Sequence, residues 1–281
     1  MGIKVGRFEL GGFDGFFLIA GPCVIEETAR TMEIAERLAA LGLKFGVPII
    51  FKASFTKANR SSVGSYTGPG IDEGLEVLAK VKREFDIPVT SDVHCRNDVD
   101  AASQVLDLIQ VPAFLSRQTE LIRCAARTGK PLNIKKGQFM SSRQVRLAAL
   151  KACSEGNRNV ILTERGTFFG YGDLVVDMRN LVLMREGGFP VVYDATHSIQ
   201  RPTGLGEVSG GDRDMITPLM RAAVAAGVDG IFFETHPEPE EALSDGPSML
   251  PLDEARSFIE QALRIREASL ACWRSEEAKK S

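Results

Sequence analysis

The chain has 281 residues, of which 44% are hydrophobic and 25% are charged, and its formal net charge is −3 at pH 7. These proportions are ordinary for a globular protein, and the negative balance argues against a nucleic-acid partner bound through bulk electrostatics. No apolar run approaches the ~20 residues that span a bilayer, and the mixed start at Met1–Phe13 does not resemble a signal peptide, so we expect no membrane partner.

The five cysteines are scattered and form no CxxC pair, which fits reduced thiols in a cytoplasmic protein. No linker, repeat or low-complexity stretch divides the chain. We therefore expect one catalytic domain over residues 1–281, with only the tail 274–281 fraying.

Eight short apolar runs punctuate the chain, and each one stops at polar or charged residues. In chain order the runs are FFLIA, PIIF, PVT, DLI, PLNI, NVIL, PVVY and GIFF. Runs of this length without polar alternation are typical of strands buried on both faces, as in a parallel sheet. Polar residues gathered at the same end of every strand are typical of a catalytic rim.

Amphipathic stretches separate the runs. We expect helices over Glu26–Phe45, Ile71–Phe85, Arg143–Ser154, Asp173–Glu186, Thr217–Ala226 and Asp253–Arg266, and shorter ones over Asn97–Gln104 and Arg117–Arg127. Alternating strands and helices predict an α/β fold of right-handed βαβ units, and eight units fit a closed (β/α)8 TIM barrel. An open doubly wound sheet is the structural alternative. The opening IKVGRFELGGFDG predicts a short β-hairpin that closes the bottom of the barrel.

Basic residues follow three of the runs, in the order Lys52, Lys57, Arg60, Lys135, Lys136 and Arg165. In a closed barrel these positions converge at one rim, and together they predict a pocket for ligands that carry phosphate and carboxylate groups. A solvated surface is the plain alternative for the whole set. A Schiff-base role for Lys52 or Lys135 is a second one, because aldolases on this fold use a lysine borne on a strand.

A further set of residues suits a metal ion. Cys23 ends the first run, His197 follows the seventh, Glu234 follows the eighth, and Asp245 lies in the loop beyond. Strands one, seven and eight are neighbours in a closed barrel, so these side chains can meet. A thiolate, an imidazole and two carboxylates suit Fe, Zn, Mn or Co rather than Ca or Mg. Taken singly, each has a plain reading, such as a buried thiol or a partner of the lysines.

Eight segments of the chain resemble the 3-deoxy-D-manno-octulosonate 8-phosphate synthases. They are AGPCVIE (20–26), FKASFTKANRSS (51–62), SDVH (91–94), QVPAFLSRQTEL (110–121), NIKKGQF (133–139), ERGTFFGYGDLVVDM (164–178), DATHSIQ (194–200) and ETHPEPEEALSDGPSML (234–250). The resemblance implies a transferase that condenses phosphoenolpyruvate with arabinose 5-phosphate and water for lipopolysaccharide biosynthesis. The related heptulosonate 7-phosphate synthases, which use erythrose 4-phosphate, are the nearer alternative; a Schiff-base aldolase and a non-catalytic phosphate-binding protein are more remote.

The resemblance also implies a role for particular residues. It implies catalytic roles for Lys52, Lys57, Asn59, Asp92, Lys135 and His197. It implies substrate binding by Lys52, Lys57, Asn59, Arg60, Ser61, Gln110, Pro112, Ala113, Phe114, Lys135, Arg165 and Gln200.

The resemblance extends to the metal and to the assembly. The family has a metal-requiring class with cysteine in the AGPC segment and a metal-free class with asparagine there, and Cys23 resembles the former. This implies a divalent metal ion (Mn, Fe, Co or Zn) held by Cys23, His197, Glu234 and Asp245. Family members are homotetramers, and the loop Phe114–Gln118 is our candidate for a contact that crosses an interface.

Overall fold

Eight parallel strands close into a ring in the computed structural model, which describes residues 2–12, 15–59, 64–169, 172–205 and 208–278. The ring closes because β14 pairs with both β3 and β11. The strands are β3 (Phe17–Gly21), β4 (Ile49–Lys52), β5 (Val89–Asp92), β6 (Leu108–Val111), β7 (Leu132–Lys135), β8 (Val160–Glu164), β11 (Val191–Asp194) and β14 (Gly230–His236). The predicted barrel is therefore confirmed, and the open-sheet alternative is wrong.

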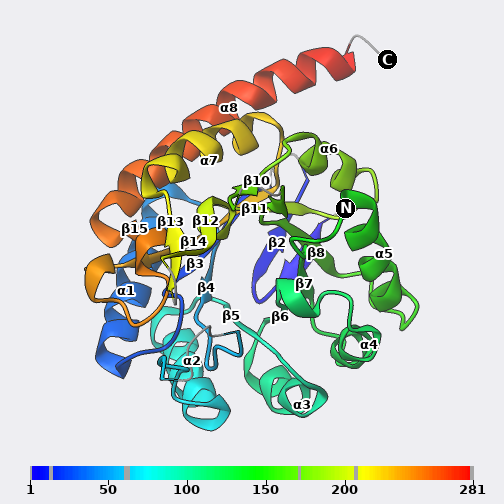
Figure 1. Cartoon of the computed structure of the whole chain (residues 1–281). Helices are drawn as coiled ribbons and strands as arrows, with labels where there is room; N and C mark the ends of the chain where they lie inside the picture. The colour runs from blue at the N-terminus through cyan, green and yellow to red at the C-terminus, as the bar shows by residue number, and fades with distance from the viewer. Residues whose placement is uncertain (1, 13–14, 60–63, 170–171, 206–207, 279–281) are drawn as a thin grey trace.

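Helices surround this ring of strands (Figure 1). They are α1 (Thr28–Phe45), α2 (Ile71–Phe85), α3 (Arg96–Val105), α4 (Thr119–Arg127), α5 (Ser142–Cys153), α6 (Arg179–Arg185), α7 (Ile216–Ala225) and α8 (Ala255–Ala278). Helix α8 runs beyond the expected end at Arg266. The segment that we expected to fray from residue 274 is helical as far as Ala278, and residues 279–281 lie outside the described part of the chain.

One predicted helix starts later than expected. Within Asp173–Glu186, Leu174–Val175 forms the short strand β10, which pairs with β9 (Thr167–Phe168), and α6 begins only at Arg179. Periodicity alone does not separate a short apolar run in a strand from one in a helix, so the sequence pattern fitted both.

Several shorter elements decorate the carboxyl end of the barrel. The strands among them are β12 (Gln200–Leu205), β13 (Val208–Gly211) and β15 (Leu250–Pro251). The single-turn helices are η1 (Ala113–Leu115), η2 (His197–Ile199), η3 (Arg213–Met215), η4 (Pro239–Glu241), η5 (Gly246–Ser248) and η6 (Leu252–Glu254).

The expected N-terminal hairpin is present. Strands β1 (Ile3–Val5) and β2 (Phe8–Leu10) pair antiparallel. The buried side chains of Ile3, Val5 and Leu10 form one cluster with inward-facing residues of the barrel, namely Phe17, Ile19, Ile50, Leu108, Ile161, Val192 and Phe232. This cluster is wholly apolar, so the hairpin closes the barrel bottom as predicted.

The inside of the barrel changes from apolar to polar along each strand. Successive side chains of a strand point to opposite faces, so the second residue after an inward apolar side chain points inward again. Such pairs are Ile50 with Lys52, Leu108 with Gln110, Ile161 with Thr163, Val192 with Asp194 and Phe232 with Glu234, and all ten residues are buried. The strands therefore deliver a layer of polar and charged side chains directly above the apolar floor.

Strand β3 departs from this rule at its end, where Gly21 follows the inward-facing Ile19. A β-carbon on Gly21 would lie only 2.1 Å from the backbone oxygen of Lys52 on the neighbouring strand. Only glycine permits this approach. The chain consequently delivers its polar side chain two residues later, at Cys23.

No helix in the described part of the chain is long and apolar enough to cross a membrane.

The apolar floor supports a prediction about stability. We expect Leu10→Ala to lower the free energy of unfolding by about 2–5 kcal/mol, because it removes a buried side chain from the hairpin cluster and leaves a cavity. Urea unfolding at pH 7 measures this loss. Lys4→Ala on the exposed face of β1 is the control, and its effect should stay within about 0.5 kcal/mol. Equal effects of the two substitutions would show that the hairpin does not seal the barrel.

Candidate active site

Two buried lysines stand at the centre of the polar layer. Lys52, at the end of β4, donates from Nζ to Glu234 Oε1 and to the backbone oxygen of Cys23, both at 2.9 Å, and lies 3.8 Å from Asp92 Oδ2. Burial opposes the charge of Lys52, but Glu234, Asp92 and Cys23 together outweigh burial and raise the lysine pKa. Lys52 is therefore a cation, and this protonation disfavours the alternative of a Schiff-base lysine, which needs a neutral amine.

Lys135, at the end of β7, is held differently. Its Nζ lies 2.5 Å from Asp194 Oδ2, 3.3 Å from His197 Nδ1 and 4.0 Å from the centroid of the Phe232 ring. Burial lowers the pKa of Lys135 although Asp194 opposes this shift. Burial would raise the pKa of Asp194, but the neighbouring His197 and Lys135 hold this pKa well below its usual range. The ammonium of Lys135 thus depends on one buried carboxylate.

A chain of side-chain hydrogen bonds crosses four adjacent strands. Thr163 donates to Asn133 (2.6 Å), Asn133 donates to Gln110 (2.8 Å), and Gln110 donates to Asp92 Oδ1 (2.8 Å). Ser54 donates to the other oxygen of Asp92 at 2.8 Å. Burial would raise the pKa of Asp92, but Lys52, Lys57 and Lys135 hold it well below its usual range. Asp92 is therefore an oriented carboxylate beneath the lysines.

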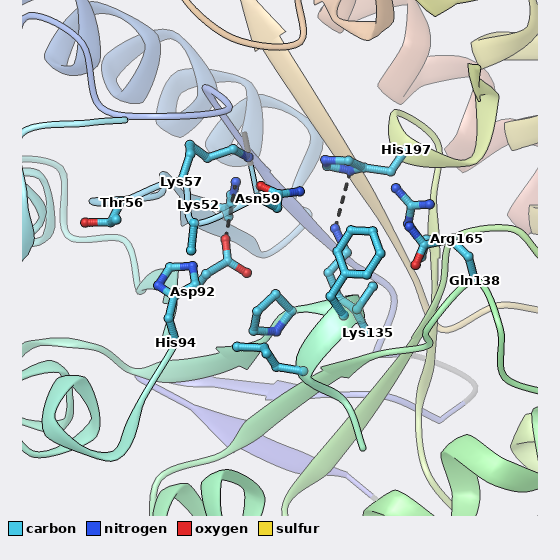
Figure 2. A pocket seen from close by; sticks show the side chains of 15 residues that line it. Lys52, Thr56, Lys57, Asn59, Asp92, His94, Lys135, Gln138, Arg165 and His197 are labelled. Carbon is cyan, nitrogen blue, oxygen red and sulfur yellow. Dashed lines mark hydrogen bonds and ion pairs between the residues drawn. The ribbon is translucent and has the colours of Figure 1, made fainter. Parts of the chain in front are cut away.

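A pocket opens above this layer (Figure 2). Loops that follow β4 to β8 and β11 build its walls. It is lined by Lys52, Thr56, Lys57, Ala58, Asn59, Asp92, His94, Pro112, Ala113, Phe114, Leu115, Lys135, Gln138, Arg165 and His197. Four of these side chains are cations and one is a carboxylate, so the pocket suits an anionic ligand.

Arg165 offers this pocket a hydrogen-bond donor that no protein group uses among the described residues. Its Nη2 donates to Gln200 Oε1 at 2.8 Å, whereas its buried Nη1 has no hydrogen-bond acceptor among the described residues. Burial lowers the pKa of Arg165, yet a guanidinium stays protonated in proteins. A buried donor without an acceptor is costly, and a phosphate or carboxylate oxygen in the pocket would satisfy it.

Lys136 points away from this pocket, unlike its neighbour Lys135. It is fully buried, and its Nζ donates to the backbone oxygens of Gly137, Met140 and Gly166 and to Thr167 Oγ1, all within 3.0–3.2 Å. Its carboxylate partner is Glu164 at 3.3 Å. Lys136 therefore joins the loops after β7 and β8 instead of contacting a ligand.

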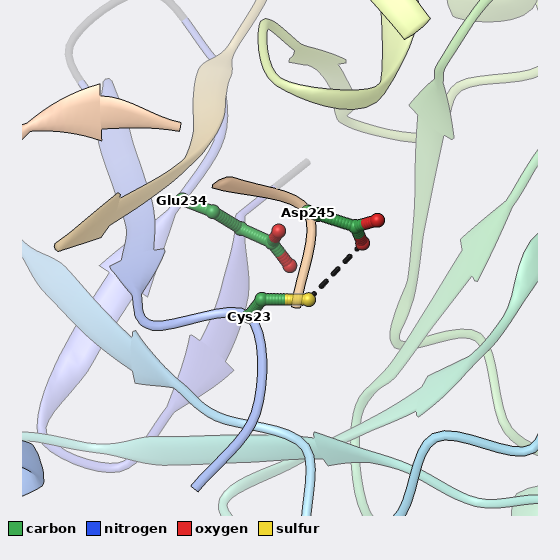
Figure 3. Close-up of side chains that lie close together, drawn as sticks. All are labelled: Cys23, Glu234 and Asp245. Atoms are coloured by element: carbon green, nitrogen blue, oxygen red, sulfur yellow. Dashed lines mark hydrogen bonds between the residues drawn. The ribbon is translucent and has the colours of Figure 1, made fainter. Parts of the chain in front are cut away.

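Cys23, Glu234 and Asp245 form a compact group beside the pocket (Figure 3). One ligand atom from each lies within 4.8 Å of the other two. Cys23 Sγ is 3.1 Å from Asp245 Oδ2 and 2.9 Å from Ser244 Oγ. Burial, with Asp245 and Glu234 nearby, raises the pKa of the Cys23 thiol, so a thiolate here needs a bound cation.

Glu234 provides a test of whether a metal fits this group. One of its oxygens accepts from Lys52, but Oε2 is buried and has no hydrogen-bond donor among the described residues. A divalent cation between Cys23, Glu234 and Asp245 would satisfy that oxygen. The mixed sulfur and oxygen donors suit Mn, Fe, Co or Zn, so the residues fit the ion that the sequence analysis expected.

His197, the fourth expected ligand, lies at the edge of this group. Its Nδ1 faces Asp194 Oδ2 at 2.9 Å, and its Nε2 lies 3.7 Å from Glu234 Oε1. A carboxylate on one ring nitrogen that leaves the other one free is the usual support of a metal-binding histidine. The structure thus brings three of the four expected ligands together and places the fourth beside them.

Most of the expected substrate-binding residues line the pocket, with a few differences. Gln110 is buried behind the pocket in the hydrogen-bond chain to Asp92, and Gln200 reaches the site through Arg165. Arg60 and Ser61 lie outside the described residues. Asp194, which pairs with Lys135, received no role from the sequence, although its place directly after a buried strand was a usable signal. Among the wall residues, Thr56 and Gln138 were also not anticipated.

Comparison with known proteins relates the whole chain to one family and to a group of named proteins. The model of the DAHP synthetase I family matches residues 4–270 of the chain. Proteins named 2-dehydro-3-deoxyphosphooctonate aldolase are similar along most of their length. The one from Desulfatibacillum aliphaticivorans is 53% identical over 252 residues, which are 90% of this chain and 92% of that protein. The one from Syntrophotalea carbinolica is 51% identical over 263 residues, which are 94% of this chain and 95% of that protein.

The buried carboxylate of Asp92 leads to a prediction with a defined pH dependence. We expect Asp92→Asn to lower the free energy of unfolding by about 3 kcal/mol at pH 7, because it leaves Lys52 with one fewer partner and sets two donors against each other in the hydrogen-bond chain. The pKa of Asp92 is lower in the folded than in the unfolded chain. Its contribution to stability is therefore complete above about pH 4 and is lost as the pH falls further.

Urea unfolding of both proteins between pH 7 and pH 3 measures this difference, which should shrink on acidification. Asp100→Asn, on the exposed side of α3, is the control and should change stability little at any pH. A wild-type advantage that grew as the pH fell would contradict the assignment of Asp92 as an ionised carboxylate.

Proposed function

This chain belongs to the DAHP synthetase I family, and within it to the group of the 2-dehydro-3-deoxyphosphooctonate aldolases, and from this membership we propose its reaction. The proposed reaction joins phosphoenolpyruvate to D-arabinose 5-phosphate, with water, to give 3-deoxy-D-manno-octulosonate 8-phosphate and inorganic phosphate. Its product serves lipopolysaccharide biosynthesis.

One observation supports this proposal most strongly: an anion pocket adjoins a sulfur and carboxylate group that fits a metal. Both substrates are anions, and the pocket offers Lys52, Lys57, Lys135 and Arg165 to receive them. The unsatisfied Nη1 of Arg165 matches a phosphate or carboxylate oxygen, and the unsatisfied Oε2 of Glu234 matches a cation. A simple binding protein for phosphate compounds would need the first feature and not the second.

The pocket residues suggest how the substrates are oriented. Lys57, Lys135 and Arg165 would bind the phosphate and carboxylate of phosphoenolpyruvate. Pro112, Ala113 and Phe114 would shape the wall of that half of the pocket, and Gln110 would support it from behind through its hydrogen bond to Asp92. Asn59, at the wall after β4, would take the sugar together with Arg60 and Ser61. Holding both substrates in one cavity converts a bimolecular encounter into a reaction between oriented partners.

The chemistry consists of one carbon–carbon bond formation followed by loss of phosphate. C3 of phosphoenolpyruvate attacks the aldehyde carbon of arabinose 5-phosphate, and the aldehyde oxygen takes a proton. Water adds to C2, and the C2–O bond to phosphate then breaks, which leaves a ketone at C2 and releases inorganic phosphate. Positive charge at C2 and negative charge on the aldehyde oxygen develop in a site where Asp92, Lys52 and Lys135 are already oriented.

A divalent cation, held by Cys23, Glu234 and Asp245 with His197 beside them, would polarise the aldehyde oxygen or a water molecule when bound. His197 keeps its Nδ1 on Asp194, so its Nε2 stays available on the side of Glu234.

We further propose that the protein acts in the cytoplasm, where its scattered cysteines stay reduced, as a single catalytic domain within a homotetramer. Phe114, half exposed at the rim, would take part in contacts between subunits.

The choice of sugar tests the proposed reaction. We expect release of inorganic phosphate from phosphoenolpyruvate only when arabinose 5-phosphate is present, with kcat/KM at least about 100-fold above that for erythrose 4-phosphate, because the pocket must match the longer sugar. A coupled phosphate assay with each sugar measures this ratio. A preference for erythrose 4-phosphate would assign the chain to the heptulosonate branch instead.

Removal of the metal tests the second part of the proposal. We expect a strong chelator to abolish phosphate release and Mn(II) to restore it, and Cys23→Ala to lower kcat/KM by more than about 100-fold, because a ligand of the cation is lost. Cys153→Ala, on α5 away from the site, is the matched control and should retain wild-type activity. Full activity after verified removal of all metal would agree with the proposed reaction and would refute the proposed requirement for a metal ion.

A further inference from the structure

One carboxylate on the Cys23 segment contacts the two other segments that carry the group of Cys23, Glu234 and Asp245. Glu26 lies three residues after Cys23 on the same loop. Its Oε1 accepts from the backbone nitrogen of Leu243 at 2.8 Å, two residues before Asp245. Its Oε2 lies 3.5 Å from Nε2 of the buried His236, two residues after Glu234. Glu26 therefore joins, at a second point, the same three stretches of chain that meet at Cys23, Glu234 and Asp245.

The loop that carries Asp245 is also held on its far side. Asp245 has a φ of 50°, in the left-handed region that residues other than glycine seldom adopt. On the far side of this loop, Arg213 donates to the backbone oxygen of Gly246 at 2.8 Å and pairs with Glu240 at 2.7 Å. Glu26 and Arg213 thus hold the loop on either side of the strained residue.

The three ligand side chains already lie close together, with one ligand atom of each within 4.8 Å of the other two. Lysines pair with both carboxylates: Lys52 Nζ lies 2.9 Å from Glu234 Oε1, and Lys57 Nζ lies 3.8 Å from Asp245 Oδ2. A contact outside the ligand set keeps the ligands close together and so lowers the cost of assembling them around an ion.

We propose that Glu26 is a positioning residue that clamps the segments bearing Cys23, Glu234 and Asp245, and so preorganises them for a divalent cation. This inference rests on the metal of the proposed function. It assigns Glu26 no contact with substrate, and it gives His236 the role of linking the end of β14 to the clamp. The Nδ1 atom of His236 lies 2.7 Å from the backbone oxygen of Glu238, and this contact orients the imidazole ring.

Titration of the metal-free protein with Co(II) tests the clamp. Absorption from the thiolate of Cys23 to Co(II) reports ligation by that sulfur and does not depend on catalysis. We expect Glu26→Ala to weaken Co(II) binding about 10–100-fold and to alter this band, as the loss of residues that orient metal ligands commonly does. Glu27→Ala is the matched control: Glu27 is the exposed neighbour with the same charge, its side chain makes no capping hydrogen bond, and binding should be unchanged.

Glu26→Gln separates positioning from charge. The glutamine keeps an oxygen for the Leu243 amide and loses the negative charge, so we expect it to recover most of the affinity that alanine loses. Hydrogen exchange of the metal-free proteins supplies a second measurement: the segment 237–249 should exchange faster in Glu26→Ala, and close to the wild-type rate in Glu26→Gln.

Each outcome decides a separate question. Wild-type Co(II) affinity and an unchanged band in Glu26→Ala would overturn the inference. So would a Glu26→Gln variant that loses as much affinity as alanine while its exchange stays at the wild-type rate, since charge alone would then explain the effect. A wild-type chain that bound no Co(II) would refute the proposed metal and with it the preorganisation, whereas faster exchange in Glu26→Ala would still establish the clamp.

Discussion

The pairing of buried lysines with buried carboxylates is the interaction on which the site depends. Lys52 and Lys135 occupy the inside of the barrel, where an unpaired ammonium would be prohibitively costly. Glu234 and Asp194 compensate them, and Asp92 lies within reach of Lys52. Because each partner comes from a different strand, the charges are satisfied only when the barrel is closed. The site is therefore built as a unit or not at all.

This pairing also couples the two halves of the site. Lys52 bonds to Glu234 of the metal-type group and, through Asp92, meets the hydrogen-bond chain that runs to Thr163. Lys135 shares Asp194 with His197, which in turn faces Glu234. A change of charge in the group of Cys23, Glu234 and Asp245 therefore alters the electrostatic environment of the two lysines, and the reverse holds as well. Such coupling suits a reaction in which one substrate must be oriented against another within a single cavity.

Two side-chain atoms of the site take no part in this pairing. The Nη1 of Arg165 and the Oε2 of Glu234 are buried without partners among the described residues. They have opposite charge: Arg165 follows β8 and Glu234 lies on β14, the two strands that flank β11 in the barrel, so the first suits an anion and the second a cation. The loops above the strands, including the one that Glu26 fastens, then complete the surroundings of each ligand.

Much of this protein was determined by the sequence alone. Eight apolar runs, each ending in polar residues, predicted the strands, the barrel and the rim, because burial on both faces leaves a local pattern. The motifs also predicted most of the pocket and the group of Cys23, Glu234 and Asp245. The tertiary structure alone decided which neighbours the charges have: that Lys135 pairs with Asp194 while Lys136 turns away, and that Glu26 meets Leu243. These contacts join residues far apart in the chain, and their geometry depends on strand register and loop path, which no local pattern of residues encodes.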